Sequence, residues 1–477
     1  MIVGLIAQLI TTDGRNEMLH RQKKNNHSAQ PACQSEQAVS LAKLVWPIFI
    51  EMILTMLVGN IDQYMVSSYS QNSVAAIGNA NQILNLLLIT FNIVSTSTTI
   101  LVSQYIGSNN KHKVSIIYTL SLFVNFIFST FIMILILVST DSIFTFMHVP
   151  EAILADAKSY MKIVGGFIFL QGIISAFSAI FRSNKMMKET MLISIAVNLI
   201  NVLGNALLIN GVGPFPVMGV AGAAWATNFS RLGGVILYIV FFIKKFETKI
   251  SVRSLKPFPK LELKKLLGIG LPSGGENLCY SMAMTVILKI INTFGTFVIN
   301  TKVYASTFAW FSFLYSSAVG QASQVIIGNY MGAGEVDLVD KRVKKTWRNA
   351  LLIAIAMAVT MFLFSDLLFG IFTDDPRVLE LGKKVMFIDI FLEMGKSTNI
   401  TLVRSLQAAG DIKFPTVIGM ISMWTIAVGC GYILGYVLNL GLVGIWIAMA
   451  LDEDIRAIVF LIRWKKGKWR NIRLADD

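Results

Sequence analysis

The chain has 477 residues, of which 55% are hydrophobic and only 14% are charged. A soluble domain carries about a quarter charged residues, so this composition excludes a soluble globular protein and predicts one that lies in a membrane. The formal net charge of +14 suits either nucleic acid or a membrane surface, and the placement of the basic residues decides between the two.

The first segment, residues 1–37, is predicted to be a cytoplasmic tail, because its apolar start is too short to span a membrane. Whether translation starts at Met1 or at Met18 stays open. About twelve long apolar stretches follow, each able to supply the roughly 20 residues of a transmembrane helix. They are continuous apolar runs, which favours helices over the alternating strands of a β-barrel. Their approximate centres are Leu57, Val94, Ile127, Leu170, Leu199, Leu237, Met282, Leu314, Met357, Phe391, Ala427 and Val459.

Basic residues gather in alternate loops, for example Arg182, Lys185 and Lys188 after the fourth stretch, while the intervening loops are neutral or acidic. This is the pattern of cytoplasmic loops, so both termini are predicted to be cytoplasmic, and the partner of the basic residues is the lipid bilayer rather than nucleic acid. Six crossings precede the long basic link, 244–265. The expected organisation is an N-terminal lobe over 38–243, a C-terminal lobe over 266–463 and a basic cytoplasmic tail over 464–477.

The two halves repeat each other at a nearly fixed offset. Such self-similarity, with six crossings in each copy, indicates a parallel repeat related by an axis along the membrane normal, as in transporters that bind their substrate between the halves. Three sets of residues carry the repeat, at offsets of 225, 225 and 222: Pro47 and Glu51 with Pro272 and Glu276, Tyr105 and Gly107 with Tyr330 and Gly332, and Gly219 and Gly222 with Gly441 and Gly444.

Asp62 is the strongest functional candidate among the intramembrane charges. A carboxylate at the centre of a membrane helix costs about 2.5–3.5 kcal/mol, and Asp62 has no charged neighbour in its own helix. Glu51 lies eleven residues earlier, three turns away on nearly the same face, so both side chains are expected to look into one cavity. Asn201, Asn205 and Thr227 can add neutral oxygens beside Asp62, a set that suits a hard cation such as Na+ or a titrating proton.

Other intramembrane charges have structural as well as functional interpretations. Glu51 and Glu276 each follow a proline by one turn, and their role stays open. Asp389 and Glu393 are four residues apart with Lys396 one turn on, which predicts an internal ion pair. Asp452, Glu453, Asp454 and Arg456 are expected to form an internal salt-bridge cluster that fixes the last helix.

Several chemistries lack their motifs. The tripeptide Gly395–Ser397 is only a fragment of a phosphate-binding loop, because Ile390 stands where the first glycine is required. Cys33, Cys279 and Cys430 are dispersed, as are the four histidines, which gives no metal or cysteine–histidine pattern. An enzyme, a cofactor and a resident metal are therefore not expected. Active transport would draw on an ion gradient or on a separate subunit.

These residues resemble the multidrug and toxic compound extrusion (MATE) transporters, in particular the bacterial NorM-like branch. The resemblance covers roughly Leu41 to Trp469 and rests on Pro47-x3-Glu51 with Gly59-Asn60-Ile61-Asp62, and on the paired segments SQYIGSNN and GNYMGAGE. Its most specific part is the C-terminal run ITLVRSLQAAGDIKFP, GLVGIWIAMALDEDIRA and RWKKGKW. The fold it implies is all-α, with twelve transmembrane helices in two pseudo-symmetric six-helix lobes around a central V-shaped cavity.

The resemblance also implies a secondary antiporter, a monomer in the bacterial inner membrane, that exports organic cations or drug-like amphiphiles in exchange for Na+ or H+. Asp62 would take part in coupling, with Asn201, Asn205 and Thr227 as polar partners. Several relatives have an acid at the Asn205 position, so the coupling ion stays open. Another group of relatives has a glutamate in its seventh membrane-spanning helix that aligns with Tyr280 rather than Glu276, although the acid in its tenth membrane-spanning helix falls on Glu393.

Two alternatives remain beside the antiporter. A flippase for lipid-linked oligosaccharides has a related fold, but it requires a strongly cationic cavity for pyrophosphate, whereas the intramembrane charges here are mainly acidic. A membrane-embedded enzyme requires a nucleophile with a base, or a metal cluster, and the sequence offers neither.

Overall fold

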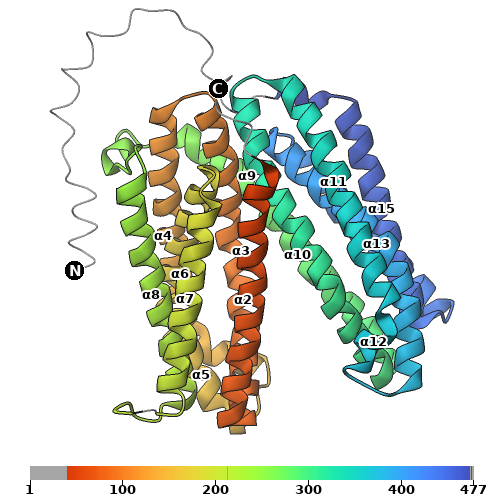
Figure 1. Ribbon diagram of the computed structural model, residues 1–477. Coiled ribbons are helices and arrows are strands. Elements are labelled where there is room, and N and C mark those ends of the chain that lie inside the picture. The colour runs from red at the N-terminus through yellow and green to blue at the C-terminus, as the bar shows by residue number, and fades with distance from the viewer. Residues whose placement is uncertain (1–39, 212, 473, 475–477) are drawn as a thin grey trace, which may run out of the picture.

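The computed structural model describes residues 40–211, 213–472 and 474, and these fold almost entirely into helices, with no strand among them (Figure 1). The first half of the chain forms α2 (Leu41–Tyr69), α3 (Gln71–Gly107), α4 (Lys111–Phe146), α5 (Glu151–Gly166), α6 (Ile168–Ser183), α7 (Met187–Leu208) and α8 (Gly219–Lys245). The second half forms α9 (Lys260–Ile291), α10 (Thr296–Gly332), α11 (Val336–Leu363), α12 (Ser365–Gly370), α13 (Pro376–Ala408), α14 (Lys413–Ser422), which continues as the π-helical turns η3 (Met423–Cys430) and η4 (Ile433–Val437), and α15 (Gly441–Lys465).

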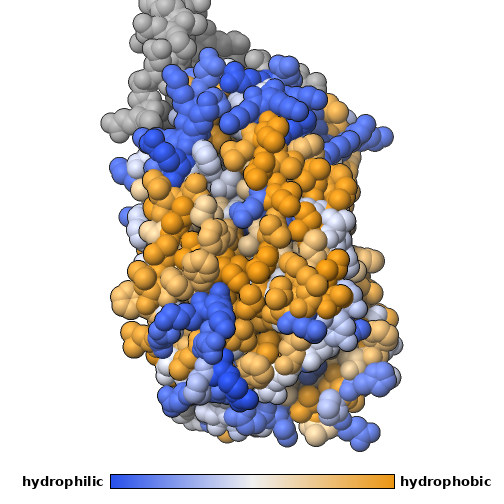
Figure 2. All heavy atoms as spheres, turned by 90° about the vertical axis from the view of Figure 1, so that its right-hand side faces the viewer, coloured by the Kyte–Doolittle hydropathy of each residue, from blue (hydrophilic) through white to orange (hydrophobic). Residues whose placement is uncertain are grey.

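The expected all-α membrane fold is confirmed. Eight of the described helical segments are long and apolar enough to cross a membrane, and α5 with α6 makes a ninth span that bends by 47°. The long helices α10, α13 and α15 complete twelve. They are less apolar because they carry interior polar side chains, such as Gln324 on α10 and Asp389 on α13, which are buried. Figure 2 shows apolar side chains across the middle of one face and hydrophilic ones at both ends, as a membrane-spanning protein requires.

The two halves meet at one end and diverge toward the other. Figure 1 shows α10, α11 and α13 leaning away from α2–α8, with the widest gap between ribbons at the end that carries α5 and α12. At the opposite end, Leu44 and Ile48 of α2 are buried with Ala318 and Ala322 of α10 in one apolar cluster. We call this the basic end, because the lysine- and arginine-rich loops and the last described residues lie there.

The repeated glycines Gly107 and Gly332 allow α3 and α10 to cross at the basic end. A Cβ atom on Gly107 would lie 2.0 Å from the backbone oxygen of Asn329, and one on Gly332 would lie 1.9 Å from that of Gln104. Gln104 and Asn329 are themselves 225 residues apart, so each half contributes the same pair to the crossing. Only glycine allows backbones to approach this closely.

The repeated glycines Gly222 and Gly444 allow the same close helix packing in both halves. A Cβ atom on Gly222 would lie 2.4 Å from the backbone oxygen of Leu208, where α8 packs on the end of α7. A Cβ atom on Gly444 would lie 2.6 Å from the backbone oxygen of Leu434, where α15 packs on η4. The sequence repeat therefore corresponds to repeated helix packing.

The link between the halves is shorter than the predicted 244–265, because α8 continues to Lys245 and α9 begins at Lys260. Pro47 and Pro272 lie inside α2 and α9 rather than at their ends. The predicted tail over 1–37 and the question of Met1 or Met18 lie outside the described residues.

Candidate functional site

Asp62 lies in a pocket of about 280 Å³ within the first half of the chain, between α2, α3, α5, α7 and α8. Asn205, Thr227, Asn81 and Tyr160 line the same pocket. Helices that are apolar towards lipid thus enclose a small polar space, and Asp62 is half-buried at its edge.

Two amide side chains lie next to the Asp62 carboxylate. Asn205 donates from Nδ2 to Oδ1 at 2.8 Å. The Asn201 amide lies beside the same carboxylate: with its nitrogen turned towards Asp62 it would donate to Oδ1 and Oδ2 at 3.0 and 2.9 Å, whereas in the opposite orientation its Nδ2 donates to Oγ1 of Thr227 at 3.5 Å. Asn201 and Asn205 are four residues apart, so one face of α7 presents both to α2. With both nitrogens facing Asp62, the two amides supply N–H donors to an ionised carboxylate, and with the Asn201 oxygen facing Asp62 they suit a protonated acid.

The pocket also contains oxygens that a cation could bind. Oδ1 of Asn205 is buried, has no hydrogen-bond partner and belongs to a residue that is 2% exposed. Oγ1 of Thr227 donates to the backbone oxygen of Ala223 at 3.0 Å and lies 3.5 Å from Nδ2 of Asn201, from which it accepts. Once the amides turn their oxygens inward, these atoms and the two Asp62 oxygens would supply the all-oxygen set that hard cations prefer.

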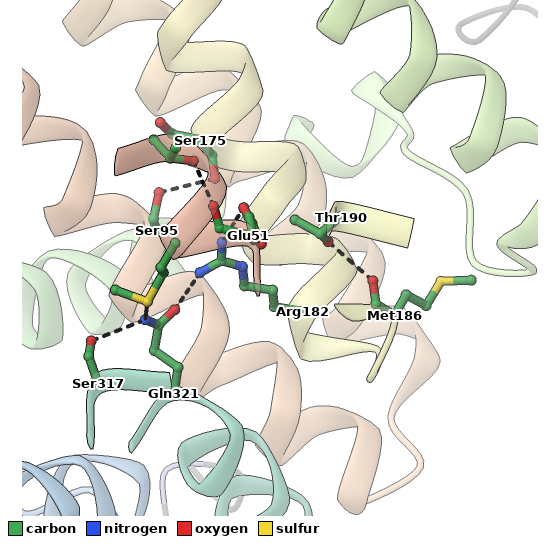
Figure 3. Close-up of polar contacts among 10 residues, drawn as sticks. Glu51, Ser95, Ser175, Arg182, Met186, Thr190, Ser317 and Gln321 are labelled. Atoms are coloured by element: carbon green, nitrogen blue, oxygen red, sulfur yellow. Dashed lines mark hydrogen bonds and ion pairs between the residues drawn. The ribbon is translucent and has the colours of Figure 1, made fainter. Parts of the chain in front are cut away.

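A larger cavity of about 680 Å³ lies between the two halves, lined by α2, α3, α6, α7 and α8 from one and α9, α10 and α13 from the other. Figure 3 shows its charged centre, where Arg182 of α6 reaches both Glu51 of α2 and Gln321 of α10. The Arg182 Nη2 to Glu51 Oε1 distance is 2.9 Å, and both side chains are mostly buried. This contact joins the two halves through one guanidinium group.

The expectation that Glu51 and Asp62 look into one cavity is wrong. Glu51 lines the larger cavity and Asp62 lines the smaller pocket. Eleven residues bring the two to the same face of α2, but they also separate them by about 16 Å along the helix axis. Angular position alone could not show that other helices divide the space between them.

The internal ion pair predicted among the charges of α13 forms between two of the three residues. Lys396 pairs with Glu393, Nζ to Oε1, at 2.5 Å, and Glu393 is fully buried. Asp389 accepts a hydrogen bond from Nε1 of Trp446 at 3.2 Å instead. The ion pair therefore joins Glu393 and Lys396, which are three residues apart. Asp389 lies two turns before Lys396 and has a neutral partner instead.

The salt-bridge cluster on α15 is confirmed for three of its four members. Arg456 pairs with Asp452 and with Glu453, each at 2.7 Å. Asp454 is not part of this cluster, because a residue two positions before Arg456 points to another side of the helix.

Two further candidates lie on α9. Glu276 accepts a hydrogen bond from Oγ1 of Thr416 at 3.4 Å. Tyr280 is 42% exposed and lines the larger cavity. Ile287, which matches Asp62 in the repeat, belongs to the apolar core of the second half. The pocket around Asp62 therefore has no counterpart with a carboxylate at that position.

Three cavity residues were not recognised as such from the sequence. Arg182 was assigned to a basic loop, but it lies in the last turn of α6 and points inward. Gln324 and Arg404 also line the larger cavity. The available signal was a polar or basic side chain inside an apolar run, which by itself does not distinguish a cavity from a helix end.

Comparison with known proteins identifies close likeness over nearly the whole chain. The MatE family profile matches residues 47–207 and again residues 272–433, and these matches begin 225 residues apart. "Uncharacterized transporter YisQ" of Bacillus subtilis (strain 168) is 39% identical over 91% of this chain and 96% of that protein. "Probable multidrug resistance protein NorM" of Thermotoga maritima is 26% identical over 90% of this chain and 92% of that protein.

A solved structure has the same fold. It is described as the outward-facing conformation of a multidrug resistance MATE family transporter of the MOP superfamily. The two chains superpose with a TM-score of 0.81 at 21% identity, over 91% of this chain and 96% of the other. At that identity the likeness concerns the fold alone.

Proposed function

This chain belongs to the MatE family of membrane transporters, and from that premise we propose that it is a secondary antiporter in the bacterial inner membrane. It exports organic cations or drug-like amphiphiles in exchange for Na+ or H+. Asp62 binds the coupling ion, with Asn201, Asn205 and Thr227 as its polar partners. The multidrug resistance names of relatives such as the Thermotoga maritima protein support the cargo class.

One observation carries the coupling role of Asp62. Its described side-chain partners are neutral amides, whereas Glu51, Glu393, Asp452 and Glu453 have cationic partners. An ionised carboxylate inside a membrane protein is costly without a counter-charge. A cation that enters the pocket therefore meets a carboxylate that forms no ion pair with any lysine or arginine in the described part of the chain.

In the proposed exchange, the ion neutralises the charge of Asp62 in its own pocket and thereby shifts the equilibrium between the two states of the transporter. In the vacant pocket, the amide nitrogens of Asn201 and Asn205 stabilise the carboxylate. A proton replaces these donors directly, whereas Na+ requires the amides to turn their oxygens inward. A positively charged cargo is released when the ion binds, because the ion shifts the equilibrium through its different affinity for the two states.

Alternating access follows from the two halves and the end at which they meet. We propose that residues 38–243 and 266–463 move as lobes about the basic end, with the link between α8 and α9 connecting them as a monomer. If the basic end faces the cytoplasm, as the distribution of lysine and arginine indicates, the halves diverge towards the outside. The ion then binds from outside and is released inside after the lobes rock.

Ion-driven efflux from membrane vesicles tests the proposal. Wild-type vesicles loaded with ethidium are given an imposed Na+ gradient or pH gradient, and one of the two should drive export. Asp62→Asn should insert normally and lose gradient-driven export. Asp374→Asn, which neutralises an exposed loop carboxylate, should export as the wild type does. Wild-type export by Asp62→Asn would refute the assignment.

A further inference from the structure

The larger cavity between the two halves contains an excess of positive charge. Two arginines and one glutamate line it, and Arg182 neutralises Glu51 at 2.9 Å. Arg404 of α13 makes no hydrogen bond or ion pair with another described residue. Glu276 interacts with Arg404 electrostatically, without an ion pair or hydrogen bond, and does not line the cavity. One guanidinium group is therefore available to a ligand.

The unpartnered atoms of this cavity are mainly hydrogen-bond donors. Nε2 of Gln324, Nδ2 of Asn198 and Nε of Arg182 are buried and have no partner, and all three residues line the cavity. Gln324 is only 3% exposed. Among the fully buried side-chain atoms of the described lining residues, Oε2 of Glu51 is the one acceptor without a partner. Each buried donor left unpaired costs about 1–3 kcal/mol, so a ligand rich in acceptors would satisfy most of this set.

The remaining wall has more polar than apolar side chains, although residues such as Ile89, Ile174 and Val197 also line it. Serine, threonine and asparagine side chains from α3, α6 and α9 face the cavity, among them Ser95, Thr99, Ser175 and Asn277. Sites for hydrophobic drugs are instead lined mainly by apolar and aromatic side chains. A solute with several hydroxyl or carbonyl groups matches this wall better than an aromatic solute.

We infer that the larger cavity is a binding site for a hydrogen-bonding organic solute that carries a carboxylate or phosphate group. Arg404 binds the oxyanion, because a guanidinium group offers paired donors that fit two oxygens at once. Gln324 adds a neutral donor, and Glu51 can accept from an ammonium group on the same solute. The inference rests on the proposed export function and changes its cargo class from organic cations to solutes that carry an oxyanion, with or without an ammonium group.

Probes that share one sugar skeleton but differ in charge test the inference, by equilibrium binding to the purified full chain. The probes are glucose, gluconate, glucose 6-phosphate and glucosamine, and short-chain phosphatidic acid represents a lipid headgroup. Gluconate and glucose 6-phosphate should bind at least about tenfold more tightly than glucose or glucosamine, the effect of one charge-assisted hydrogen bond.

Substitutions then locate the site. Arg404→Gln should abolish the tenfold preference and Gln324→Met should reduce it. Arg348→Gln, which removes an equal charge from an exposed position on α11, should leave it unchanged. Equal binding of all four sugars, or an unchanged preference in Arg404→Gln, would overturn the inference. Binding of phosphatidic acid alone would also overturn it and would favour a lipid flippase.

This outcome is separable from that of the proposed function. Oxyanion binding is measured without a gradient, and Asp62 lies in the other pocket, so Asp62→Asn should bind the probes as the wild type does. Loss of oxyanion preference in that variant would contradict the division into two sites.

Discussion

An alanine at Gly107 would place a methyl group 2.0 Å from the backbone oxygen of Asn329. Ordinary contact begins at 3.4 Å, so α3 and α10 would have to separate by about 1.4 Å at their crossing. The obstacle is backbone, which cannot rotate away as a side chain can. We expect a loss of about 1–3 kcal/mol, the usual cost of overpacking, and a lower apparent melting temperature of the purified protein in detergent.

Gly268→Ala is the matched control. Gly268 lies inside α9, and a Cβ atom there would meet nothing within 4 Å. Alanine is favoured over glycine in a helix by up to about 1 kcal/mol, so this variant should melt at the wild-type temperature or above it. Both substitutions replace glycine with alanine, but Gly107→Ala should lower the melting temperature and Gly268→Ala should leave it unchanged or raise it.

The matching glycine in the second half, Gly332, provides a second test of the same crossing. Gly332→Ala should cause a similar loss, because its methyl group would meet Gln104 at 1.9 Å. The double variant should lose less than the two single losses together, since helices already separated by one methyl group accommodate the second. Wild-type melting of either single variant would refute this account of how the halves are joined.

Two further predictions concern other parts of the molecule. Arg456→Met should prevent stable accumulation in the membrane, because it leaves Asp452 and Glu453 buried without their cation, at a cost of about 3–5 kcal/mol. Fluorescence-detected size-exclusion chromatography would measure the yield of folded protein. A monodisperse variant at the wild-type yield would contradict this prediction. Asp375→Ala should lower the apparent melting temperature slightly, because the Asp375 side chain caps α13 by accepting from the backbone nitrogen of Arg377 at 3.0 Å. Hydrogen bonds from Arg377 hold the pKa of Asp375 below its ordinary value of 3.8. The stability that ionised Asp375 contributes is therefore present above pH 3.8 and is lost as the pH falls below the lowered pKa. A stability difference between variant and wild type that persists well below that pKa would contradict the role of the ionised carboxylate.

The fold was predictable because its signals are local. Long apolar runs give membrane helices, and the repeated glycines at Gly107 and Gly332 mark a backbone crossing that the structure contains. The polar helices α10, α13 and α15 were also predicted, although their interior polar groups lower their hydropathy. Residue spacing within one helix was sufficient to predict the Glu393–Lys396 and Asp452–Arg456 pairs.

The arrangement of the cavities was less predictable because it depends on contacts between helices. The Glu51–Arg182 pair joins residues 131 positions apart, and nothing in either segment specifies the other as its partner. Arg182 also has the sequence context of a basic loop. The separation of Glu51 from Asp62 depends on which helices pass between them, which the spacing along α2 does not reveal.

The central claim is that Asp62 exchanges one inorganic ion for cargo. The most direct measurement is ion release from vesicles that hold the purified protein, triggered by the solute that the efflux assay shows to be exported. The wild type should move Na+ or H+ in the opposite direction as the solute moves, and Asp62→Asn should move neither. Ion movement of wild-type size in Asp62→Asn vesicles would contradict the account.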